Sequence, residues 1–182
     1  MRKVILTVGP QCAGKSSFCQ KAVALDPDII LVSRDAICIE LFGSVWLSPY
    51  TGGHLVAWEK MWEILKEHLK QESVRILLDA WNDSPESRRK MTTKLRQMGV
   101  DRIEAWHFIT PENVCFEWFF QREIPNYIGR MKKYHMDNYC RVYRAFQKYP
   151  VDVEQGFDRI VRIDASTKSP EHVLSFQTSL EL

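Results

Sequence analysis

The sequence predicts an α/β fold, a three-layer sandwich in which a parallel five-stranded sheet carries helices on both faces. Short apolar runs alternate along the chain with longer segments whose apolar residues recur at helical spacing. That alternation is typical of βαβ units. The chain has 182 residues, of which 45% are hydrophobic and 26% charged, a length and balance that suit one globular domain. We therefore interpret residues 1–182 as a single domain.

Five short apolar runs are predicted to be the strands of this sheet. They are rich in Val, Ile and Leu, as expected for strands that are buried on both faces. Glycines, prolines or charged residues bound them, which limits each run to the length of a strand. The runs cover residues 3–8, 29–32, 74–80, 102–109 and 158–164.

Six segments between the strands are predicted to be helices. Two of them begin with a hydroxyl residue followed by proline, Ser84-Pro85 and Thr110-Pro111, a pairing that suits an N-cap and a first helical position. Gly99 is placed to end the first of these two helices. The chain after the last strand is interpreted as a polar loop and a short tail. The predicted helices cover residues 15–25, 36–42, 54–71, 84–98, 110–123 and 127–148.

Charge and cysteine content exclude several classes of protein. The formal net charge is +2, so a nucleic-acid surface would have to be a local patch. No apolar run approaches the roughly 18 residues needed to span a membrane, and the first run is interpreted as a strand, not as a signal peptide. The five cysteines show no paired spacing, which favours reduced thiols and a cytoplasmic location. We expect no membrane partner, and the sequence gives no indication of oligomeric state.

The segment from Gly9 to Ser16, GPQCAGKS, matches the pattern G-x-x-x-x-G-K-[ST] at every fixed position. A predicted strand precedes it and a predicted helix follows, so backbone N–H groups and the helix N-terminus can surround a diphosphate. Lys15 is placed to reach the β- and γ-phosphates of ATP or another NTP, and Ser16 to bind Mg²⁺. This pattern indicates the nucleotide-binding loop of a P-loop NTPase. The residues predicted to bind the nucleotide are Gly9, Gln11, Cys12, Ala13, Gly14, Lys15, Ser16 and Ser17.

Ligands of an open parallel sheet bind at the carboxyl ends of its strands, where three aspartates are predicted to lie. Asp35 follows the second strand and is a candidate general base; the alternative is a helix N-cap. Asp79 ends the apolar run RILLD and is a candidate Mg²⁺ ligand; the alternative is a cap on a turn. Asp164 follows the fifth strand.

Cationic and aromatic residues later in the chain leave alternatives open. Arg122 is a candidate for covering the γ-phosphate, or a surface arginine at a helix end. Trp46 and Tyr50 can stack on a base or fill the core. A helical stripe of cations can bind a phosphodiester backbone, or is only the solvated face of an amphipathic helix. The stripe consists of Arg130, Lys133, Arg141, Arg144 and Lys148, with Asp137 among them.

Four blocks of the sequence form a pattern: MRKVILTVGPQCAGKSSF, LVSRD, LLDAWNDSPESRR, and a tryptophan and an arginine spaced W-x-x-x-R before IP. Together they resemble the kinase domain of phage-type polynucleotide 5′-hydroxyl kinases, within the wider group of zeta-toxin-like and chloramphenicol-phosphotransferase-like P-loop kinases. The resemblance spans roughly residues 1–150, with the segment from about 111 to 148 as the lid. The sequence contains no D-x-D-G-T phosphatase signature.

The resemblance implies a role for each matched residue. Lys15, Asp35 and Arg122 would be catalytic, with Asp35 as the base for a 5′-hydroxyl. Ser16 and Asp79 would hold the metal. In this family an arginine commonly lies three residues after the catalytic aspartate and contacts the acceptor phosphate, and here that position is Cys38. The residues assigned to substrate binding are Arg34, Asn82 and Arg130.

The leading hypothesis is an ATP-dependent kinase that acts on the 5′-hydroxyl of a DNA or RNA end. The first alternative keeps the chemistry and replaces the acceptor with a small molecule such as a nucleotide, sugar or antibiotic, which Cys38 favours. The second alternative is a nucleotide-binding switch or NTPase. Transfer that is lost in Asp35→Ala while ATP binding is retained would distinguish a kinase from a switch.

Overall fold

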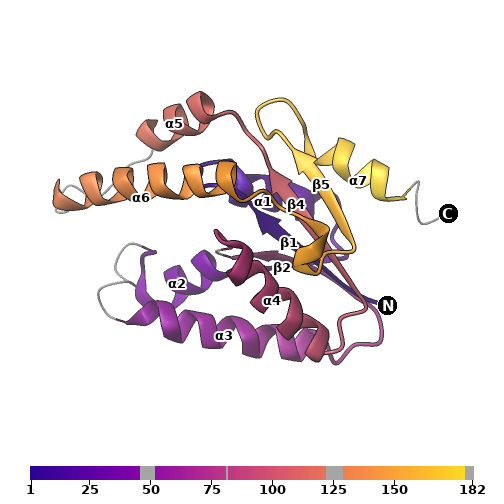
Figure 1. Cartoon of the computed structure of the whole chain (residues 1–182). Coiled ribbons are helices and arrows are strands. Elements are labelled where there is room, and N and C mark those ends of the chain that lie inside the picture. Colours follow the sequence, from indigo (N-terminus) through magenta and orange to yellow (C-terminus); the bar gives the residue numbers. More distant parts are fainter. Residues whose placement is uncertain (46–51, 81, 122–128, 179–182) are drawn as a thin grey trace.

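The computed structural model describes residues 1–45, 52–80, 82–121 and 129–178, without the side chains of 129–136, 138–139 and 176–178. Strands and helices alternate along these ranges, as Figure 1 shows. The strands are β1 (Arg2–Val8), β2 (Ile29–Ser33), β3 (Val74–Asp79), β4 (Arg102–Phe108) and β5 (Arg159–Ile163). The helices are α1 (Lys15–Leu25), α2 (Arg34–Phe42), α3 (Gly53–His68), α4 (Pro85–Gln97), α5 (Glu112–Gln121), α6 (Gly129–Lys148), the 3₁₀ turn η2 (Val153–Gln155) and α7 (Pro170–Thr178).

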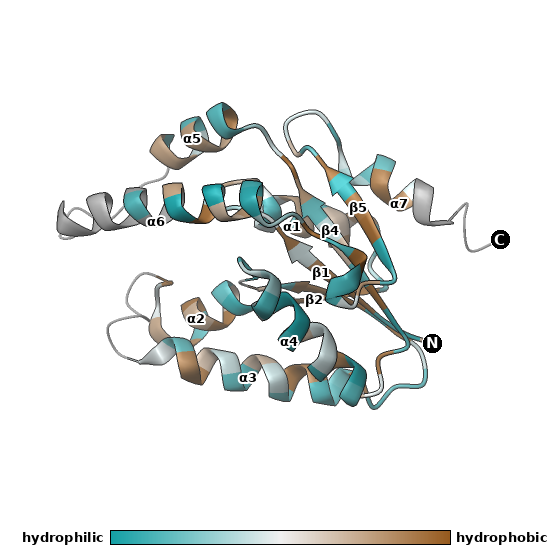
Figure 2. Cartoon of the chain, viewed as in Figure 1, coloured by the Kyte–Doolittle hydropathy of each residue, from teal (hydrophilic) through white to brown (hydrophobic). Residues whose placement is uncertain are grey.

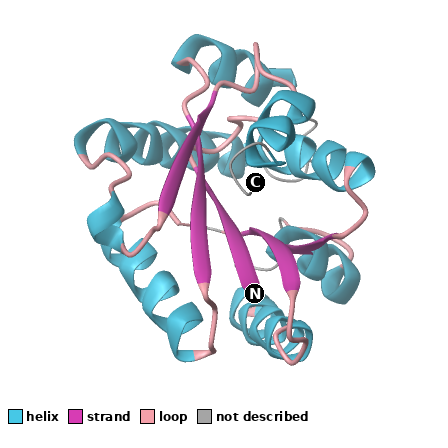
Figure 3. Cartoon of the chain, turned by 90° about the vertical axis from the view of Figure 1, so that its right-hand side faces the viewer, coloured by secondary structure: helices cyan, strands magenta, loops and turns pink. Residues whose placement is uncertain are grey.

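The five strands form one sheet in the order β2-β3-β1-β4-β5, and every neighbouring pair is parallel. In the centre of the sheet, Val4 of β1 lies opposite Ile76 of β3 and Ile103 of β4. Figure 3 shows the fanned strands with helices on both sides. The predicted three-layer α/β sandwich is confirmed, because each apolar run occurs as a strand at the predicted place.

Alternate side chains of the strands build a core on each face of the sheet. Val4 and Leu6 point into a first core, which α2, α3 and α4 cover. Ile5 points into a second core, which α1, α5 and α7 cover. In Figure 2 the strands carry brown segments, with teal at the polar residues of β4 and β5, and the helices show both teal and brown parts. Both faces of the sheet are therefore buried, which explains why the middle of β1, β2 and β3 is apolar on successive residues. The strands β4 and β5 also carry polar residues, among them Glu104 and Arg162.

Helix α6 contacts both cores. Val142 and Phe146 belong to the first core, whereas Cys140 and Tyr143 pack against the second. In the view of Figure 1, α5 and α6 extend past the carboxyl ends of the strands, with α2 and the start of α3 below them. The lid segment predicted between about 111 and 148 thus corresponds to α5, α6 and the undescribed residues between them.

Helix boundaries confirm some predictions and correct others. Ser84 caps α4 in a capping box with Pro85 at its start, and Gly99 follows the helix with a φ of +83°. The chain after β5 is not only a loop and tail, because residues from Pro170 onward form α7. Val173, which is buried in the second core, anchors that helix. The segment has few apolar residues, so the spacing of its side chains did not predict a helix. The proline at its first position is nevertheless typical of a helix start.

All five cysteines are free thiols. Within the described ranges, the model contains no helix with the length and apolarity needed to cross a membrane.

Candidate active site

The loop between β1 and α1 has the tight curvature that a phosphate-binding loop requires. Gly14 adopts a left-handed conformation with a φ of +84° and caps α1. A Cβ at this position would lie 2.9 Å from Cβ of Ala165 and 3.1 Å from the indole ring of Trp118. At Gly9 a Cβ would lie 2.8 Å from Cβ of Phe108. Glycine is thus required at both ends of the loop, because neighbouring chain segments approach the backbone closely.

Cys12 adopts the left-handed conformation without being a glycine. Its φ is +60°, and within the described ranges it is the non-glycine residue with positive φ. For a residue with a Cβ this conformation costs about 1–2 kcal/mol. Strain of this kind is common where a loop must aim its N–H groups at a ligand.

The ammonium group of Lys15 folds back over the loop. Its Nζ donates to the carbonyl oxygens of Gly9 at 3.0 Å and Pro10 at 2.7 Å. Burial lowers the pKa of Lys15, and the nearby carboxylates of Asp79 and Asp35 act in the opposite direction. The lysine is therefore a partly desolvated donor beside two carboxylates. An anionic phosphate would offer it a stronger acceptor than the two carbonyl groups do.

Ser16 and Asp79 meet as the sequence predicts for a pair that shares a metal. The Ser16 hydroxyl donates to Oδ2 of Asp79 at 2.7 Å, and the Thr7 hydroxyl donates to Oδ1 at 2.8 Å. Asp79 is 7% exposed and Thr7 is fully buried. The carboxylate is thus fixed by one hydroxyl from β1 and one from the start of α1. The role of Thr7 was missed, because a threonine inside an apolar run reads as an ordinary strand residue.

Asp35 lies in the first turn of α2, directly after β2. Ser33, and not Asp35, caps this helix, since its hydroxyl accepts from the backbone N–H of Ala36 at 3.3 Å. The Asp35 side chain is 52% exposed and pairs with Nη2 of Arg34 at 3.2 Å. A helix N-terminus favours the negative charge of this carboxylate. Asp35 is therefore not the N-cap of α2. Its carboxylate is open to solvent, and its charge acts to raise the pKa of Lys15.

Asn82 lies in the loop after β3, where it is 5% exposed. Its Nδ2 donates to the backbone carbonyls of Ala80 at 3.0 Å and Thr7 at 3.4 Å. Oδ1 is buried without a hydrogen-bond partner among the residues that the structure describes. The side chain therefore ties the loop to β1 and keeps one buried acceptor for a further donor.

Arg88, from the PESRR block, connects the loop after β3 to the residues that directly follow α6. Its side chain is fully buried, and burial lowers its pKa to about 10, so it remains charged at neutral pH. The helical spacing of Arg88 with buried Met91 and Leu95 was an unused signal that it faces inward. Its hydrogen-bond acceptors are the side chain of Gln155 and the backbone carbonyls of Asn82, Asp83, Tyr149 and Pro150.

Thr110 does not act as the predicted N-cap of α5. The helix begins at Glu112, and the Pro111 carbonyl accepts from the N–H of Cys115 at 3.0 Å. The Thr110 hydroxyl instead donates to the carbonyl of Ala13 at 3.0 Å and accepts from the N–H of Ala165 at 3.1 Å. It therefore ties the phosphate-binding loop to the loop after β5.

Several predicted site residues lie outside the described part of the chain. Arg122, Trp46 and Tyr50 are among them. Arg130 falls within the first turn of α6, but its side chain is outside the description. Of the predicted cationic stripe, the exposed residues with described side chains are Arg141, Arg144 and Lys148.

The structure therefore brings Lys15, Ser16, Asp79 and Asp35 together at the carboxyl edge of the sheet. A phosphate-binding loop, a hydroxyl–carboxylate pair and an open carboxylate at a helix start are the parts that phosphoryl transfer uses. Fold and site thus define a P-loop kinase.

Comparisons with known proteins agree with this class. A family model described as an AAA domain matches residues 4–144, and the chain belongs to this family. Curated proteins gave no match. Solved structures share the fold at low sequence identity. The chain superposes on a shikimate kinase from Bacteroides thetaiotaomicron with a TM-score of 0.63 and 16% identity, and each chain is covered completely.

A fungal RNA kinase and a chain of an RNA repair complex are also similar. A fungal RNA kinase gives a TM-score of 0.60 at 16% identity, covering 98% of this chain and 43% of that chain. A chain of the Pnkp1/Rnl/Hen1 RNA repair complex gives 0.57 at 19% identity, covering 81% and 46%. The chain thus spans less than half the length of these two proteins. At such identities the likeness concerns the fold alone.

Proposed function

We propose that this P-loop kinase transfers the γ-phosphate of ATP to the 5′-hydroxyl of a DNA or RNA end. One observation carries the proposed chemistry: the carboxylate of Asp35 is 52% exposed and lies close enough to Lys15 to act on its pKa. A general base must be accessible to the proton that it takes, and must lie beside the group that is transferred. The exposure of Asp35 and the effect of its charge on the pKa of Lys15 support this role.

The transfer itself is an in-line displacement. The acceptor oxygen attacks the γ-phosphorus, its proton passes to Asp35, and the bond from the γ-phosphorus to the β–γ bridging oxygen breaks to release ADP. Lys15 leaves the carbonyls of Gly9 and Pro10 and binds the phosphate oxygens instead. Arg34, paired with Asp35, keeps that carboxylate oriented.

The Ser16 hydroxyl and the Asp79 carboxylate fit a magnesium ion. Both are hard oxygen donors, and Mg²⁺ is usually held by one or two such groups together with substrate phosphates. The hydrogen bond of 2.7 Å between the two groups supports a shared ion, because their oxygens lie next to each other. Bound there, Mg²⁺ would neutralise charge on the phosphate oxygens. Thr7 keeps the Asp79 carboxylate aimed at that point.

A polyanionic acceptor is supported by the cations on α6. Arg141, Arg144 and Lys148 are exposed on the helix that extends past the carboxyl edge of the sheet. Arg130 and Lys133 continue the same spacing toward its start. Cations along one helix face can follow a phosphodiester backbone. The buried Nε of Arg34 has no acceptor among the described residues, which suits a guanidinium that binds a phosphate oxygen of the acceptor strand.

One observation favours a small-molecule acceptor as the second candidate. Cys38 is fully buried in the first core, so this position of α2 offers no cation to an acceptor phosphate. The shikimate kinase that covers the whole chain is a small-molecule enzyme by its name. Under this alternative Lys15 and Asp35 keep their roles and only the acceptor changes.

The test is a transfer assay with γ-labelled ATP. The acceptors are a 5′-hydroxyl RNA oligonucleotide, its DNA equivalent, the same oligonucleotides carrying a 5′-phosphate, and a panel of nucleosides, sugars, shikimate and aminoglycosides. Label in the 5′-hydroxyl oligonucleotides, and none in the 5′-phosphorylated ones, supports the proposal. Label confined to a compound of the panel replaces it with the second candidate. ATP hydrolysis that no acceptor accelerates would instead indicate a nucleotide-driven switch.

A further inference from the structure

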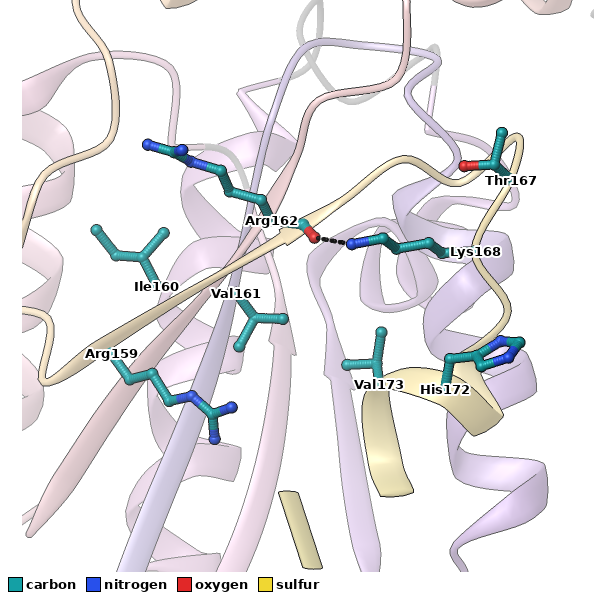
Figure 4. Close-up of a pocket in the computed structure, with 8 residues that line it drawn as sticks. All are labelled: Arg159, Ile160, Val161, Arg162, Thr167, Lys168, His172 and Val173. Atoms are coloured by element: carbon teal, nitrogen blue, oxygen red, sulfur yellow. Dashed lines mark hydrogen bonds between the residues drawn. The ribbon is translucent and has the colours of Figure 1, made fainter. Parts of the chain in front are cut away.

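The open edge of the sheet at β5 forms a groove that the proposed transfer reaction does not use. In the sheet order β5 is terminal, so it has a neighbouring strand, β4, on one side only. A cavity of about 730 Å³ lies along its other side and continues to the loop and helix that follow it. Figure 4 shows the side chains of this β5 groove. Apart from Thr167, its polar lining is basic: Arg159 and Arg162 from β5, Lys168 from the loop and His172 from α7.

The described residues that line the β5 groove include no carboxylate. The acids on either side of β5 have partners of their own, and Asp158, which precedes it, pairs with Arg96. Asp164 accepts from the N–H of Ser166 at 2.9 Å, and a hydrogen bond from Ser169 lowers the pKa of Glu171. The positive charge of the groove is therefore not compensated by its own lining, which favours an anionic occupant.

The cations do not converge on one point. Ile160 packs against the first core and Val161 against the second, so the alternation of a strand puts Arg162 on one face and Arg159 on the other. In Figure 4 the two guanidinium groups point away from each other. A single phosphate or carboxylate cannot bind both. An extended chain with negative charges on both of its faces can.

The backbone of β5 offers hydrogen bonds to such a chain. The Ile163 carbonyl accepts from the N–H of Ile109, on the side of β4. Because successive residues of a strand direct their polar groups to opposite sides, the Arg162 carbonyl points to the open side. There it accepts only from Nζ of Lys168 at 3.1 Å among the hydrogen bonds of the described chain. An exposed lysine is easily displaced from one carbonyl group, since a surface contact of this kind contributes little.

We propose that the β5 groove binds an acidic, extended segment of a partner protein, which adds to the sheet as a sixth strand beside β5. Main-chain hydrogen bonds to Ile160 and Arg162 would fix its register. Acidic side chains on its two faces would meet Arg159 on one side and Arg162 on the other. The proposal is independent of the acceptor of the kinase.

The test uses a fluorescent peptide of roughly eight residues, long enough to cover β5. Glu-Glu-Val-Val repeats place acids on both faces. A second peptide carries the same sequence with alternate amides N-methylated, which removes strand pairing and keeps the charge. The protein variants are the wild type, the double reversal Arg162→Glu/Lys168→Glu, and the control Lys66→Glu, an exposed lysine on α3. Circular dichroism verifies that each variant is folded.

Strand addition predicts saturable binding of the first peptide to the wild type and to Lys66→Glu. Both N-methylation and the double reversal should weaken binding by about tenfold or more, equivalent to about 1.4 kcal/mol. Hydrogen exchange of the Ile160 and Arg162 amides should slow when the peptide is bound. Three results would overturn the proposal: no binding, equal binding of the N-methylated peptide, or tighter binding of single-stranded oligothymidine than of the peptide. The last would assign the groove to nucleic acid.

Discussion

The hydroxyl of Ser16 lies 2.7 Å from a carboxylate oxygen of Asp79, although the two residues are 63 positions apart in the chain. Thr7 binds the other oxygen of the same carboxylate. The buried carboxylate at the end of β3 is therefore hydrogen-bonded to the start of α1 and to the central strand β1. This junction sets the position at which a metal and a terminal phosphate would meet.

Asp79→Asn should separate metal binding from nucleotide binding. The amide keeps the size of the side chain but loses the charge that would attract Mg²⁺. We expect the Mg²⁺ concentration for half-maximal transfer to rise by about tenfold, and the free energy of unfolding to fall by about 1 kcal/mol. Transfer measured over a series of Mg²⁺ concentrations checks this, with Glu59→Gln on α3 as control. An unchanged Mg²⁺ requirement would exclude Asp79 as a ligand.

Arg88→Met should destabilise the protein strongly, whereas its neighbour Arg89→Met should not. The Arg88 guanidinium is buried and donates to the Gln155 side chain and to four backbone carbonyls. Its removal leaves these acceptors buried and unpaired, at a cost of about 3 kcal/mol or more. Arg89 is exposed on the same helix. Urea unfolding of both variants measures the difference, and equal midpoints would contradict the connecting role of Arg88.

His107→Phe should flatten the dependence of stability on pH. Burial, with smaller contributions from Arg162 and Arg88, lowers the pKa of His107 to about 4 from its usual 6.5. The unfolded chain binds a proton below pH 6.5 that the folded chain rejects until about pH 4. Stability is therefore fully present above pH 6.5 and is lost as the pH falls toward 4, by up to about 3 kcal/mol.

Phenylalanine removes this titration and keeps a ring beside Phe146, whose centroid lies 6.4 Å from that of His107. Thermal unfolding of both proteins between pH 7.5 and 4.5 tests the expectation. Parallel curves over that range would show that another group accounts for the loss.

Cys12→Gly should stabilise the phosphate-binding loop, and Cys12→Ala should not. The φ of +60° at Cys12 disfavours any residue with a Cβ. Glycine relieves this strain, and we expect a gain of about 1 kcal/mol in the free energy of unfolding, reduced by the lost contacts of the thiol. Alanine retains the Cβ and tests whether the gain comes from the backbone. Equal stabilisation by the two substitutions would assign the effect to the sulfur instead.

Most of the fold was predictable because both faces of the sheet are buried. This makes β1, β2 and β3 apolar on successive residues, and the glycine and proline residues between the runs mark their ends. The helix from Pro170 was missed because it anchors to the core mainly through Val173. Its short apolar stripe cannot be distinguished by spacing from a polar tail.

The candidate site was predictable where one local pattern defines it, as in the segment from Gly9 to Ser16. Contacts between distant segments were not. The Thr110-Pro111 pair has the local pattern of a helix start, yet tertiary structure directs the hydroxyl to Ala13 and Ala165. Arg88 is buried and its neighbour Arg89 is exposed. The only difference in the local sequence is that Arg88 lies on the same helix face as the apolar residues. The sequence shows that Cys38 replaces the arginine common in the family that the chain resembles. That Cys38 is buried could not be predicted, because its burial depends on how α2 packs against the core.

The most direct test of the account is Asp35→Asn, measured by transfer from γ-labelled ATP and by ATP affinity in parallel. The substitution removes the proton acceptor and leaves Lys15, Ser16 and Asp79 in place. Glu40→Gln, an exposed acid on the same helix, is the matched control. We predict that transfer falls by about 100-fold or more while the Kd for ATP stays within about threefold of the wild type. Transfer at the wild-type rate in Asp35→Asn would contradict the assignment of this carboxylate as the base.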